Sequence, residues 1–289
     1  MIKNLYLKIL AFLCNSLPFF LEYTRNHNTK GKGQICKYLK LKNELLAECN
    51  GIKYSLNLRD DVQQQIYMNV YEKFNVKFIL SLLRQGYTFL DAGANVGAYT
   101  LQVAKKLGSG DNIYSFEPEP DNFKRLDYNC KLNPFSKTVN RYQVALTNYN
   151  GTAALHKSED FHSGWHSLTE FKDISIGKIE VSAVTLDSFI EKLGINKIDL
   201  VKIDVEANEF ELLEGAENCL KEKIFTKIFI EFNGSRLAEK DKTFKDFIDL
   251  FEKYKYYPQR INLEMARKLL NGTLKQEKIC ENFLFELIL

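Results

Sequence analysis

The sequence predicts an α/β fold built on one open, mostly parallel sheet, and three observations support this. Residues 87–104 read as a strand, a glycine turn and a helix, because Tyr87–Leu90 is apolar, Gly93 and Gly97 frame a turn, and apolar residues then recur at helical spacing. Further short apolar runs alternate with helical patterns, which is typical of parallel strands joined by helices. Two more strand-like runs, 255–263 and 281–289, close the chain.

The remaining elements follow in order from apolar spacing and helix signals. After the first strand, the sequence predicts strands over Ile113–Phe116, Thr138–Leu146, Ile198–Ile203 and Lys227–Phe232, and helices over 121–132, 187–193, 209–219 and 240–254. Thr185 is the expected cap of the helix at 187–193. Asn150 and Gly151 predict a hairpin into 152–156, because this pair suits a tight turn.

Residues 1–59 are expected to form an N-terminal extension, and residues 60–289 the main domain. The sequence predicts a short basic amphipathic helix at the N-terminus. Its apolar residues fall near one face: Ile2, Leu5, Ile9, Phe12 and Leu13. Packing of this face on the protein itself is the preferred interpretation, and a peripheral contact of residues 1–25 with a membrane surface is the alternative. Polar residues interrupt the apolar run too often for a membrane-spanning helix, and no A-x-A site marks a signal peptide.

A linker and a hairpin complete the extension. Residues 24–34 contain glycines and little that could be buried, so they predict a linker. The strand-like runs Glu44–Cys49 and Ile52–Leu58 flank Asn50–Gly51, the pair that best fits a type I′ turn. From 62 to 83, apolar residues recur at helical spacing after Asp60 or Asp61 as the cap, so a helix or helix pair leads into the first strand.

Composition argues against several classes of function. Lys and Arg total 40 against 37 Asp and Glu, a net charge of +3 without a basic run, so a nucleic-acid partner is not expected. The six cysteines are scattered, with no C-x-x-C pair and no clustered histidines to complete a zinc site. They predict reduced thiols in a cytoplasmic protein. The sequence carries no signal for an oligomeric state.

The glycine turn predicts a nucleoside cofactor that lacks a pyrophosphate. A G-x-G-x-x-G pattern started at Gly93 needs glycine at 95 and 98, but the chain has Asn95 and Ala98. The close approach of a pyrophosphate is therefore not expected, and S-adenosylmethionine is the common cofactor of this description. A strand turn with no ligand is the alternative.

Glu117 is the expected partner of the cofactor's ribose. It ends the second strand, twenty residues beyond Gly97. A carboxylate there can accept hydrogen bonds from both ribose hydroxyls. The alternative is a charge that favours the start of the next helix, since Glu119 and Asp121 lie at the same helix end.

Residues 157–177 predict a lid or an acceptor-binding loop. Outside any clear element, this segment carries the only tryptophan, Trp165, and two histidines, His162 and His166. Ser163 stands where the H-E-x-x-H motif of a zinc protease needs its glutamate, so that class is excluded. Exposed loop histidines without a function are the alternative.

The ordered motifs of residues 60–235 resemble the FkbM family of S-adenosylmethionine-dependent methyltransferases. The matching segments are Tyr71–Glu72, FLDAGANVGAYT, YSFEPEPDNF, VALTNYNGTAAL, VTLDSFIEKLGINKIDLVKIDVEANEFELLEGA and IFIEFNG. The resemblance implies a Rossmann-like class I methyltransferase fold, with seven mostly parallel strands and a reversed edge strand at 281–289. It also implies a hydroxyl acceptor, commonly on a sugar or natural product, so a saccharide or glycan precursor is the expected substrate.

The resemblance also assigns site residues. The implied cofactor contacts are Asp91, Gly93, Asn95, Gly97 and Glu117, to which their neighbours Ala94 and Pro118 are added. Asp204 and Glu206 form the implied acidic motif beside the acceptor. Ala207 departs from the family's glycine, so a turn with positive φ would be strained there or the helix entry shifted. Asn148 follows Thr147 where the family often has an aspartate, so a contact to the adenine would use its amide.

Asp204 is the first candidate for the base that takes the proton of the acceptor hydroxyl, followed by Glu206 and His166. Alternatively, Asp204 only binds the cofactor's amino group or pairs with Lys202. Asp204 and Glu206 suit Mg²⁺, but no third ligand is evident, so no metal is expected. A non-catalytic binding or scaffold module, and a methyltransferase with a non-sugar acceptor, are the alternative functions.

Overall fold

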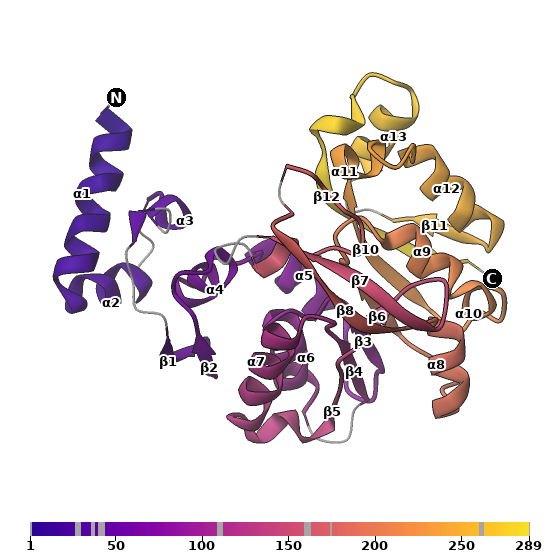
Figure 1. Cartoon of the computed structure of the whole chain (residues 1–289), viewed down its shortest axis with the longest axis horizontal. Helices are drawn as coiled ribbons and strands as arrows, with labels where there is room; N and C mark the ends of the chain where they lie inside the picture. The colour runs from indigo at the N-terminus through magenta and orange to yellow at the C-terminus, as the bar shows by residue number, and fades with distance from the viewer. Residues whose placement is uncertain are drawn as a thin grey trace.

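The computed structural model describes residues 2–26, 30–35, 38–39, 44–108, 112–158, 163–173, 175–259 and 263–288. Its centre is a seven-stranded sheet in the order β11-β12-β10-β9-β3-β4-β5 (Figure 1). These strands are β3 (Phe89–Ala92), β4 (Ile113–Phe116), β5 (Val139–Tyr142), β9 (Leu200–Ile203), β10 (Lys227–Asn233), β11 (Tyr256–Pro258) and β12 (Cys280–Leu287). β12 pairs antiparallel with β10 and β11, whereas β5, β4, β3, β9 and β10 pair in parallel. The predicted mostly parallel, seven-stranded α/β sheet is confirmed. The reversed strand was expected at an edge of the sheet, but β12 lies between β10 and β11, and β11 forms the edge.

The order of the strands reverses at β3, which lies between β4 and β9. In open parallel sheets, ligands bind at the carboxyl edge of the strands beside such a reversal. The sheet therefore places the ends of β3, β4, β9 and β10 around one candidate site.

Helices on both sides of the sheet bury two separate apolar clusters. Neighbouring residues of β3 point to opposite sides, so Phe89 joins one cluster and Leu90 the other. The first cluster includes side chains of α4 (Asp61–Tyr67), α5 (Lys73–Leu82), α6 (Ala98–Leu107) and α7 (Pro120–Lys131). The second includes side chains of α8 (Leu186–Leu193), α9 (Glu209–Glu214), α10 (Glu217–Lys221), α11 (Gly234–Ala238), α12 (Phe244–Lys253) and α13 (Leu263–Leu270). Short 3₁₀ turns lie at Pro134–Thr138, Ser163–Trp165 and Gln276–Lys278.

Several helix boundaries follow the predicted capping residues. Asp60 caps α4, because its Oδ1 accepts a hydrogen bond from the Gln63 N–H at 2.9 Å. Thr185 caps α8 in the same way, through the Ser188 N–H at 3.2 Å. The pattern predicted from 62 to 83 is a pair of helices, α4 and α5.

A small second sheet corrects two expectations. It holds β6 (Ala145–Leu146), β7 (Gly151–Lys157) and β8 (Gly177–Val184) in the order β6-β8-β7. The predicted strand Thr138–Leu146 is therefore divided between two sheets, with β5 in one and β6 in the other. The hairpin predicted at Asn150–Gly151 is also wrong, because β8 lies between β6 and β7 and pairs with both.

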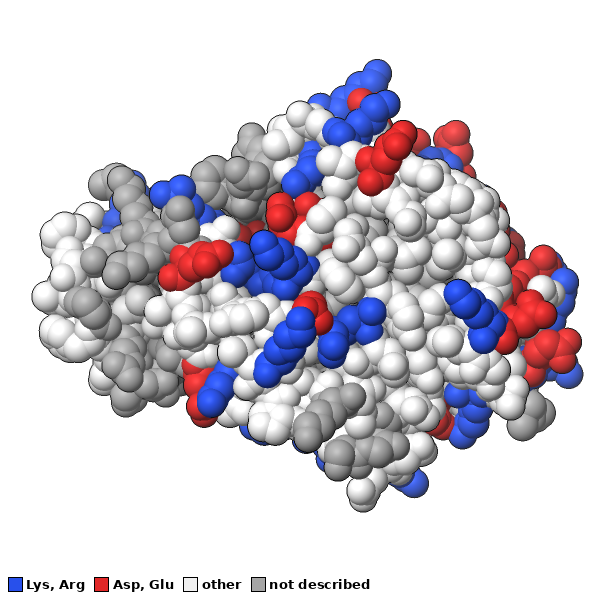
Figure 2. Space-filling view, turned by 60° about the horizontal axis from the view of Figure 1, so that its bottom comes forward, with Lys and Arg blue, Asp and Glu red and all other residues white. Residues whose placement is uncertain are grey.

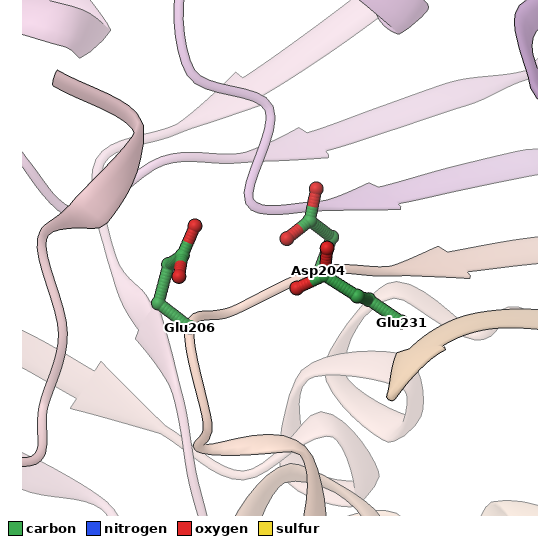
Figure 3. A group of neighbouring side chains, drawn as sticks. All are labelled: Asp204, Glu206 and Glu231. Atoms are coloured by element: carbon green, nitrogen blue, oxygen red, sulfur yellow. The ribbon is translucent and has the colours of Figure 1, made fainter. Parts of the chain in front are cut away.

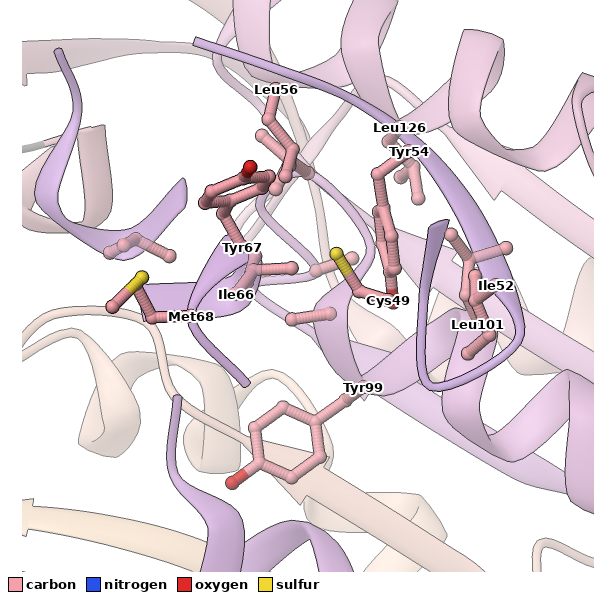
Figure 4. Packing of buried hydrophobic residues seen from close by; sticks show 14 of the residues in the cluster. Cys49, Ile52, Tyr54, Leu56, Ile66, Tyr67, Met68, Tyr99, Leu101 and Leu126 are labelled. Atoms are coloured by element: carbon pink, nitrogen blue, oxygen red, sulfur yellow. The ribbon is translucent and has the colours of Figure 1, made fainter. Parts of the chain in front are cut away.

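The hairpin of β1 (Leu45–Cys49) and β2 (Ile52–Leu56) confirms the predicted turn. Asn50 and Gly51 have φ values of 53° and 69°, the positive values that a type I′ turn requires. The hairpin packs on α4, α6 and α7 in the first cluster, as the labelled side chains of Figure 4 show. Asn133 binds its outer edge, accepting from the Lys53 N–H at 2.9 Å and donating to the Lys53 carbonyl at 2.8 Å. The hairpin thus shares its core with the main domain.

The N-terminal segment forms α1 (Ile2–Ser16), α2 (Pro18–Asn26) and α3 (Lys32–Ile35). The predicted single helix is therefore two, and both ends of the linker predicted at 24–34 are helical. The interpretation that the face of Leu5, Ile9 and Phe12 packs on the protein is wrong. These side chains are 60%, 51% and 68% exposed, and α1 instead buries Leu7, Leu10, Ala11 and Cys14. Because α1 is apolar on both faces, spacing alone did not identify the buried one.

Two expectations concern membrane-spanning helices and the state of the cysteines. Among the described segments, no helix is both long enough and apolar enough to cross a bilayer. Five of the six cysteines lie in those segments, and all five are free thiols; Cys36 lies outside them.

Candidate active site

A cavity of about 360 Å³ opens at the carboxyl edge of the central strands. One part of its wall comes from the turn after β3 and the end of β4, and the other from the ends of β9 and β10 and the loop after β7. The polar and aromatic lining residues are Asp61, Gln65, Tyr71, Glu72, Asn95, Phe116, Glu117, Asn122, Trp165, His166, Asp204, Glu206, Asn208 and Glu231. The strand order thus brings together residues that lie more than 150 positions apart in the sequence.

The glycine turn needs Gly93 for two physical reasons. Its φ of 80° lies in the left-handed region, and a Cβ at this position would lie 1.8 Å from the backbone oxygen of Asp204. The Gly93 and Ala94 N–H groups both donate to the Phe116 carbonyl, at 3.0 and 2.9 Å. The turn is therefore fixed between the ends of β4 and β9, and Gly93 lines the cavity with backbone alone.

Asp91 and Gly97 do not line the cavity, and they stabilise this turn through contacts on its other side. Asp91 is fully buried, and its Oδ2 accepts a hydrogen bond from Thr100 Oγ1 at 2.6 Å. Gly97, with φ 92°, lies at the start of α6, where a Cβ would lie 2.8 Å from Leu126 Cδ1. Both residues thus hold the turn in place.

Glu117 is buried at the end of β4 and is held by two backbone donors. Its Oε2 accepts from the Asn95 N–H at 2.8 Å, and its Oε1 accepts from the Glu119 N–H at 2.9 Å. Burial raises the pKa of Glu117 to about 7, although these hydrogen bonds act in the opposite direction. Each carboxylate oxygen has a second acceptor position, so the group can still bind hydroxyls in the cavity. Pro118 lines the cavity beside it.

A buried lysine links the two parts of the site. Lys202 is 3% exposed, and its Nζ lies 3.0 Å from the Gly93 carbonyl, 3.2 Å from Asp204 Oδ2 and 3.5 Å from Asp91 Oδ1. Burial lowers the pKa of Lys202, but the carboxylates of Asp204 and Asp91 outweigh burial and leave it above its usual value. The pairing of Asp204 with Lys202 that the sequence left open is thus present.

Glu72 is a site residue to which the sequence analysis gave no role. It has φ 34° and no capping hydrogen bond at the start of α5, and its carboxylate lines the cavity. Its Oε2 accepts hydrogen bonds from the Tyr99 hydroxyl and, at 3.1 Å, from Asn75 Nδ2. The Tyr99 ring in turn lies 5.2 Å from Lys202 Nζ, which is a cation–π distance.

Three carboxylates gather at the acceptor side of the cavity (Figure 3). Asp204 and Glu206 follow β9 and Glu231 lies on β10, and one oxygen from each lies within 4.8 Å of the other two. Burial, followed by the charges of neighbouring carboxylates, raises the pKa of Glu206 and of Glu231 well above the usual value. The group could hold a divalent cation, with Glu231 as the third ligand that the sequence analysis did not find. The expectation that no metal is needed stays a prediction.

The turn that carries Glu206 keeps the conformation typical of glycine although it has none. Glu206 and Ala207 have φ values of 53° and 67°, so the strain expected at Ala207 is present. Glu209 Oε1 accepts from the Val205 and Ala207 N–H groups, both at 3.2 Å, and Lys240 Nζ donates to the Ala207 carbonyl at 2.8 Å. These contacts hold the turn, and α9 begins at Glu209 as predicted, without a shift.

A comparison with known protein families decides the identity. The model of the methyltransferase FkbM domain matches residues 91–258, more than half of the chain. The chain belongs to the FkbM methyltransferase family. The matched domain is therefore that of an S-adenosylmethionine-dependent methyltransferase, and the resemblance found in its motifs is confirmed.

The curated relatives of this FkbM methyltransferase are distant. The hexuronic acid methyltransferase AglP of Haloferax volcanii is 26% identical over 155 residues, which cover 54% of this chain and 60% of AglP. The 2-O-methyltransferase NoeI of Sinorhizobium fredii is 25% identical over 200 residues, which cover 63% of this chain and 78% of NoeI. The 31-O-demethyl-FK506 methyltransferase FkbM of Streptomyces tacrolimicus is 27% identical over 162 residues, which cover 47% of this chain and 62% of that protein.

In this FkbM methyltransferase, two of the predicted loop residues reach the cavity. Trp165 and His166 line it, and His166 Nδ1 accepts a hydrogen bond from the Ser158 N–H at 3.1 Å. Phe161 and His162 lie outside the described residues. Ser167 Oγ donates to the Glu206 carbonyl at 2.5 Å and thereby joins this loop to the acidic turn.

The structure does not bring Asn148 to the cavity of this FkbM methyltransferase. Asn148 is exposed after β6, and its Nδ2 donates to Glu214 Oε2 at 2.8 Å. The segment beside the end of β4 that does line the cavity is Val144–Leu146. These apolar residues precede Asn148, and no sequence motif distinguishes them from the amide as a ligand contact.

Proposed function

We propose that this methyltransferase transfers a methyl group to a hydroxyl of a saccharide or glycan precursor. The observation that carries the proposal is one cavity in which the glycine turn and Glu117 face a group of three carboxylates. Carboxylates accept hydrogen bonds from several hydroxyls at once, and the Trp165 ring adds a flat apolar surface beside them. The name of one relative, a hexuronic acid methyltransferase, agrees with a sugar acceptor, and that of another, a 2-O-methyltransferase, agrees with transfer to an oxygen.

The residues around the turn fit S-adenosylmethionine. A side chain at Gly93 would collide with Asp204, so the turn leaves backbone alone against a ligand, and Glu117 offers acceptor positions for two ribose hydroxyls. Apolar side chains of Val144 and Leu146 provide a surface for the adenine. When bound, the cofactor supplies an electrophilic methyl group on a sulfonium.

Asp204 is the proposed base for the acceptor hydroxyl. Its backbone abuts Gly93 and its carboxylate faces Glu206 and Glu231, so it lies at the boundary between the two parts of the cavity. The ion pair with Lys202 fixes the orientation of the ionised carboxylate, which is the form that can accept a proton. The remaining carboxylates orient the acceptor by accepting hydrogen bonds from its other hydroxyls.

Replacement of Glu117 by glutamine is expected to weaken S-adenosylmethionine binding on the order of a hundredfold, because two charge-assisted hydrogen bonds become weaker or are lost. Since the pKa of Glu117 is about 7, protonation below that pH removes the acceptor form, so the affinity of the wild type should fall as the pH is lowered from 8 to 6. Calorimetric titration at both pH values measures this. The variant should lose most of the pH dependence.

The exposed neighbour Asp121 provides the control for Glu117. An Asp121→Asn variant removes a charge near the same end of α7 but does not touch the cavity, so its affinity and pH dependence should match the wild type. Equal affinity of Glu117→Gln and wild type would exclude the assignment of Glu117 to the ribose.

Turnover is expected to survive removal of divalent cations by EDTA. Lys202 already offsets the charge of Asp204, and the raised pKa values of Glu206 and Glu231 favour relief of their repulsion by a proton. Initial rates with and without EDTA measure this. If activity is lost and Mg²⁺ restores it, the three carboxylates are a metal site, and Glu231→Gln should then raise the Mg²⁺ concentration needed for half-maximal rate.

Formation of S-adenosylhomocysteine tests the proposed function directly. Incubation of the full chain with S-adenosylmethionine and single sugars, uronic acids or nucleotide sugars should release it only when a saccharide acceptor is present. Release that depends instead on a polyketide alcohol or an amine would replace the proposed substrate class.

A further inference from the structure

The N-terminal helices carry an exposed apolar face. On α1, Leu5, Ile9 and Phe12 follow one another at helical spacing and are 60%, 51% and 68% exposed. On α2, Phe19 and Tyr23 are one turn apart and 66% and 54% exposed. Figure 2 shows white, uncharged side chains along the outer left edge of the molecule, the end that α1 and α2 occupy in Figure 1.

This face belongs to the positively charged part of the chain. Residues 1–43 contain eight Lys and Arg but one acidic residue, Glu22, which gives a net charge of +7. The whole chain has a net charge of +3, so residues 44–289 carry −4. Helix α1 contains no acidic residue, and Lys8 is exposed beside the apolar face. Positive charge and exposed apolar surface therefore coincide in one segment.

We propose that α1 and α2 dock this enzyme on an anionic lipid bilayer surface. An interfacial helix buries apolar and aromatic side chains among the acyl chains while Lys and Arg attract anionic headgroups, and this segment presents both. The exposed phenylalanines and leucine match the apolar boundary of the headgroups, a contact that nucleic acid does not offer. A symmetric contact with a second copy is disfavoured, because it would bring together two segments of +7 each.

The docking helices and one wall of the cavity share the first apolar cluster. Leu7 and Leu10 of α1 belong to the same apolar cluster as Val62 and Ile66 of α4. Val62 also lines the cavity, together with Asp61 and Gln65. The segment proposed to dock and the α4 wall of the cavity are thus parts of one apolar core.

Sedimentation of the full chain with vesicles tests the proposal. Vesicles of phosphatidylcholine with about one third of phosphatidylglycerol should bind the protein at low salt, pure phosphatidylcholine should bind it more weakly, and rising salt should release it. Phe12→Glu should lower partitioning to the anionic vesicles at least about tenfold, because a charge replaces the central apolar side chain. The exposure of Phe12 makes loss of folding unexpected, which a thermal melt checks.

Phe74 supplies the matched control. It is 70% exposed on α5, outside the N-terminal helices, so Phe74→Glu should leave vesicle binding unchanged. The proposal is overturned if the wild type does not bind anionic vesicles or if the two variants lose binding equally. It is also overturned if Phe12→Glu converts a dimer to a monomer in analytical ultracentrifugation while vesicle binding persists, since the face would then join two copies.

Discussion

Gly93→Ala is expected to abolish S-adenosylmethionine binding. The added Cβ would lie 1.8 Å from the Asp204 backbone oxygen, a distance that no side-chain rotation relieves, and the φ of 80° adds strain. The turn would have to move away from β9 and would no longer present its backbone to the cavity. Calorimetric titration should detect no binding at cofactor concentrations about a hundredfold above the wild-type dissociation constant.

A Gly86→Ala variant distinguishes the effect of this collision from the effect of backbone strain alone. It has φ 86°, nearly the same as Gly93, but nothing lies within 4 Å of the position of its Cβ. Gly86→Ala should therefore cost about 1 kcal/mol of folding free energy and leave cofactor affinity unchanged. If Gly93→Ala binds the cofactor as the wild type does, the turn is not the cofactor site.

Asp204→Asn is expected to lower turnover at least about a hundredfold, because the amide cannot accept the proton of the acceptor hydroxyl. The amide has nearly the same shape, and Lys202 keeps its contacts with Gly93 and Asp91, so cofactor affinity should change by less than about threefold. Steady-state kinetics and calorimetry of the same preparation measure the two effects separately.

Asp249 provides a surface control, since its side chain is 56% exposed on α12 and forms an ion pair with Lys245 there. Asp249→Asn should leave turnover and binding unchanged. Near wild-type turnover in Asp204→Asn would transfer the role of base to Glu206, Glu231 or His166. The pH dependence of turnover, measured in a variant of each of these three residues, then identifies the base.

The local pattern predicted the central part of the fold because each signal there is short-range. Apolar runs fixed β3, β4, β9 and β10 to within two residues, and the Asn50–Gly51 and Asp60 signals fixed a turn and a cap. The prediction of one strand over 138–146 is wrong because the apolar pattern of a strand is the same whichever sheet the strand joins. Which sheet each part joins depends on the distant strand β8, which pairs with β6.

The candidate site was predicted only where residues share a local motif. Glu231 was missed because it is an isolated acidic residue in an apolar strand, and only the pairing of β10 with β9 brings it to Asp204. Glu72 lies before the first strand of the central sheet, lines the cavity and accepts a hydrogen bond from Tyr99, and no local motif marks it. Asn148 was assigned from its position in a motif, but the short strand β6 directs it to Glu214.

The atom that receives the methyl group shows whether the acceptor is a saccharide hydroxyl. The full chain is incubated with S-adenosylmethionine carrying an isotopically labelled methyl group and with hexose- and uronic-acid-containing saccharides, and the product is analysed by NMR. We expect a labelled methyl group on a saccharide oxygen, formed by the wild type and lost in Asp204→Asn. A labelled methyl group on nitrogen or carbon, or one found only on alcohols that are not saccharides, would contradict it.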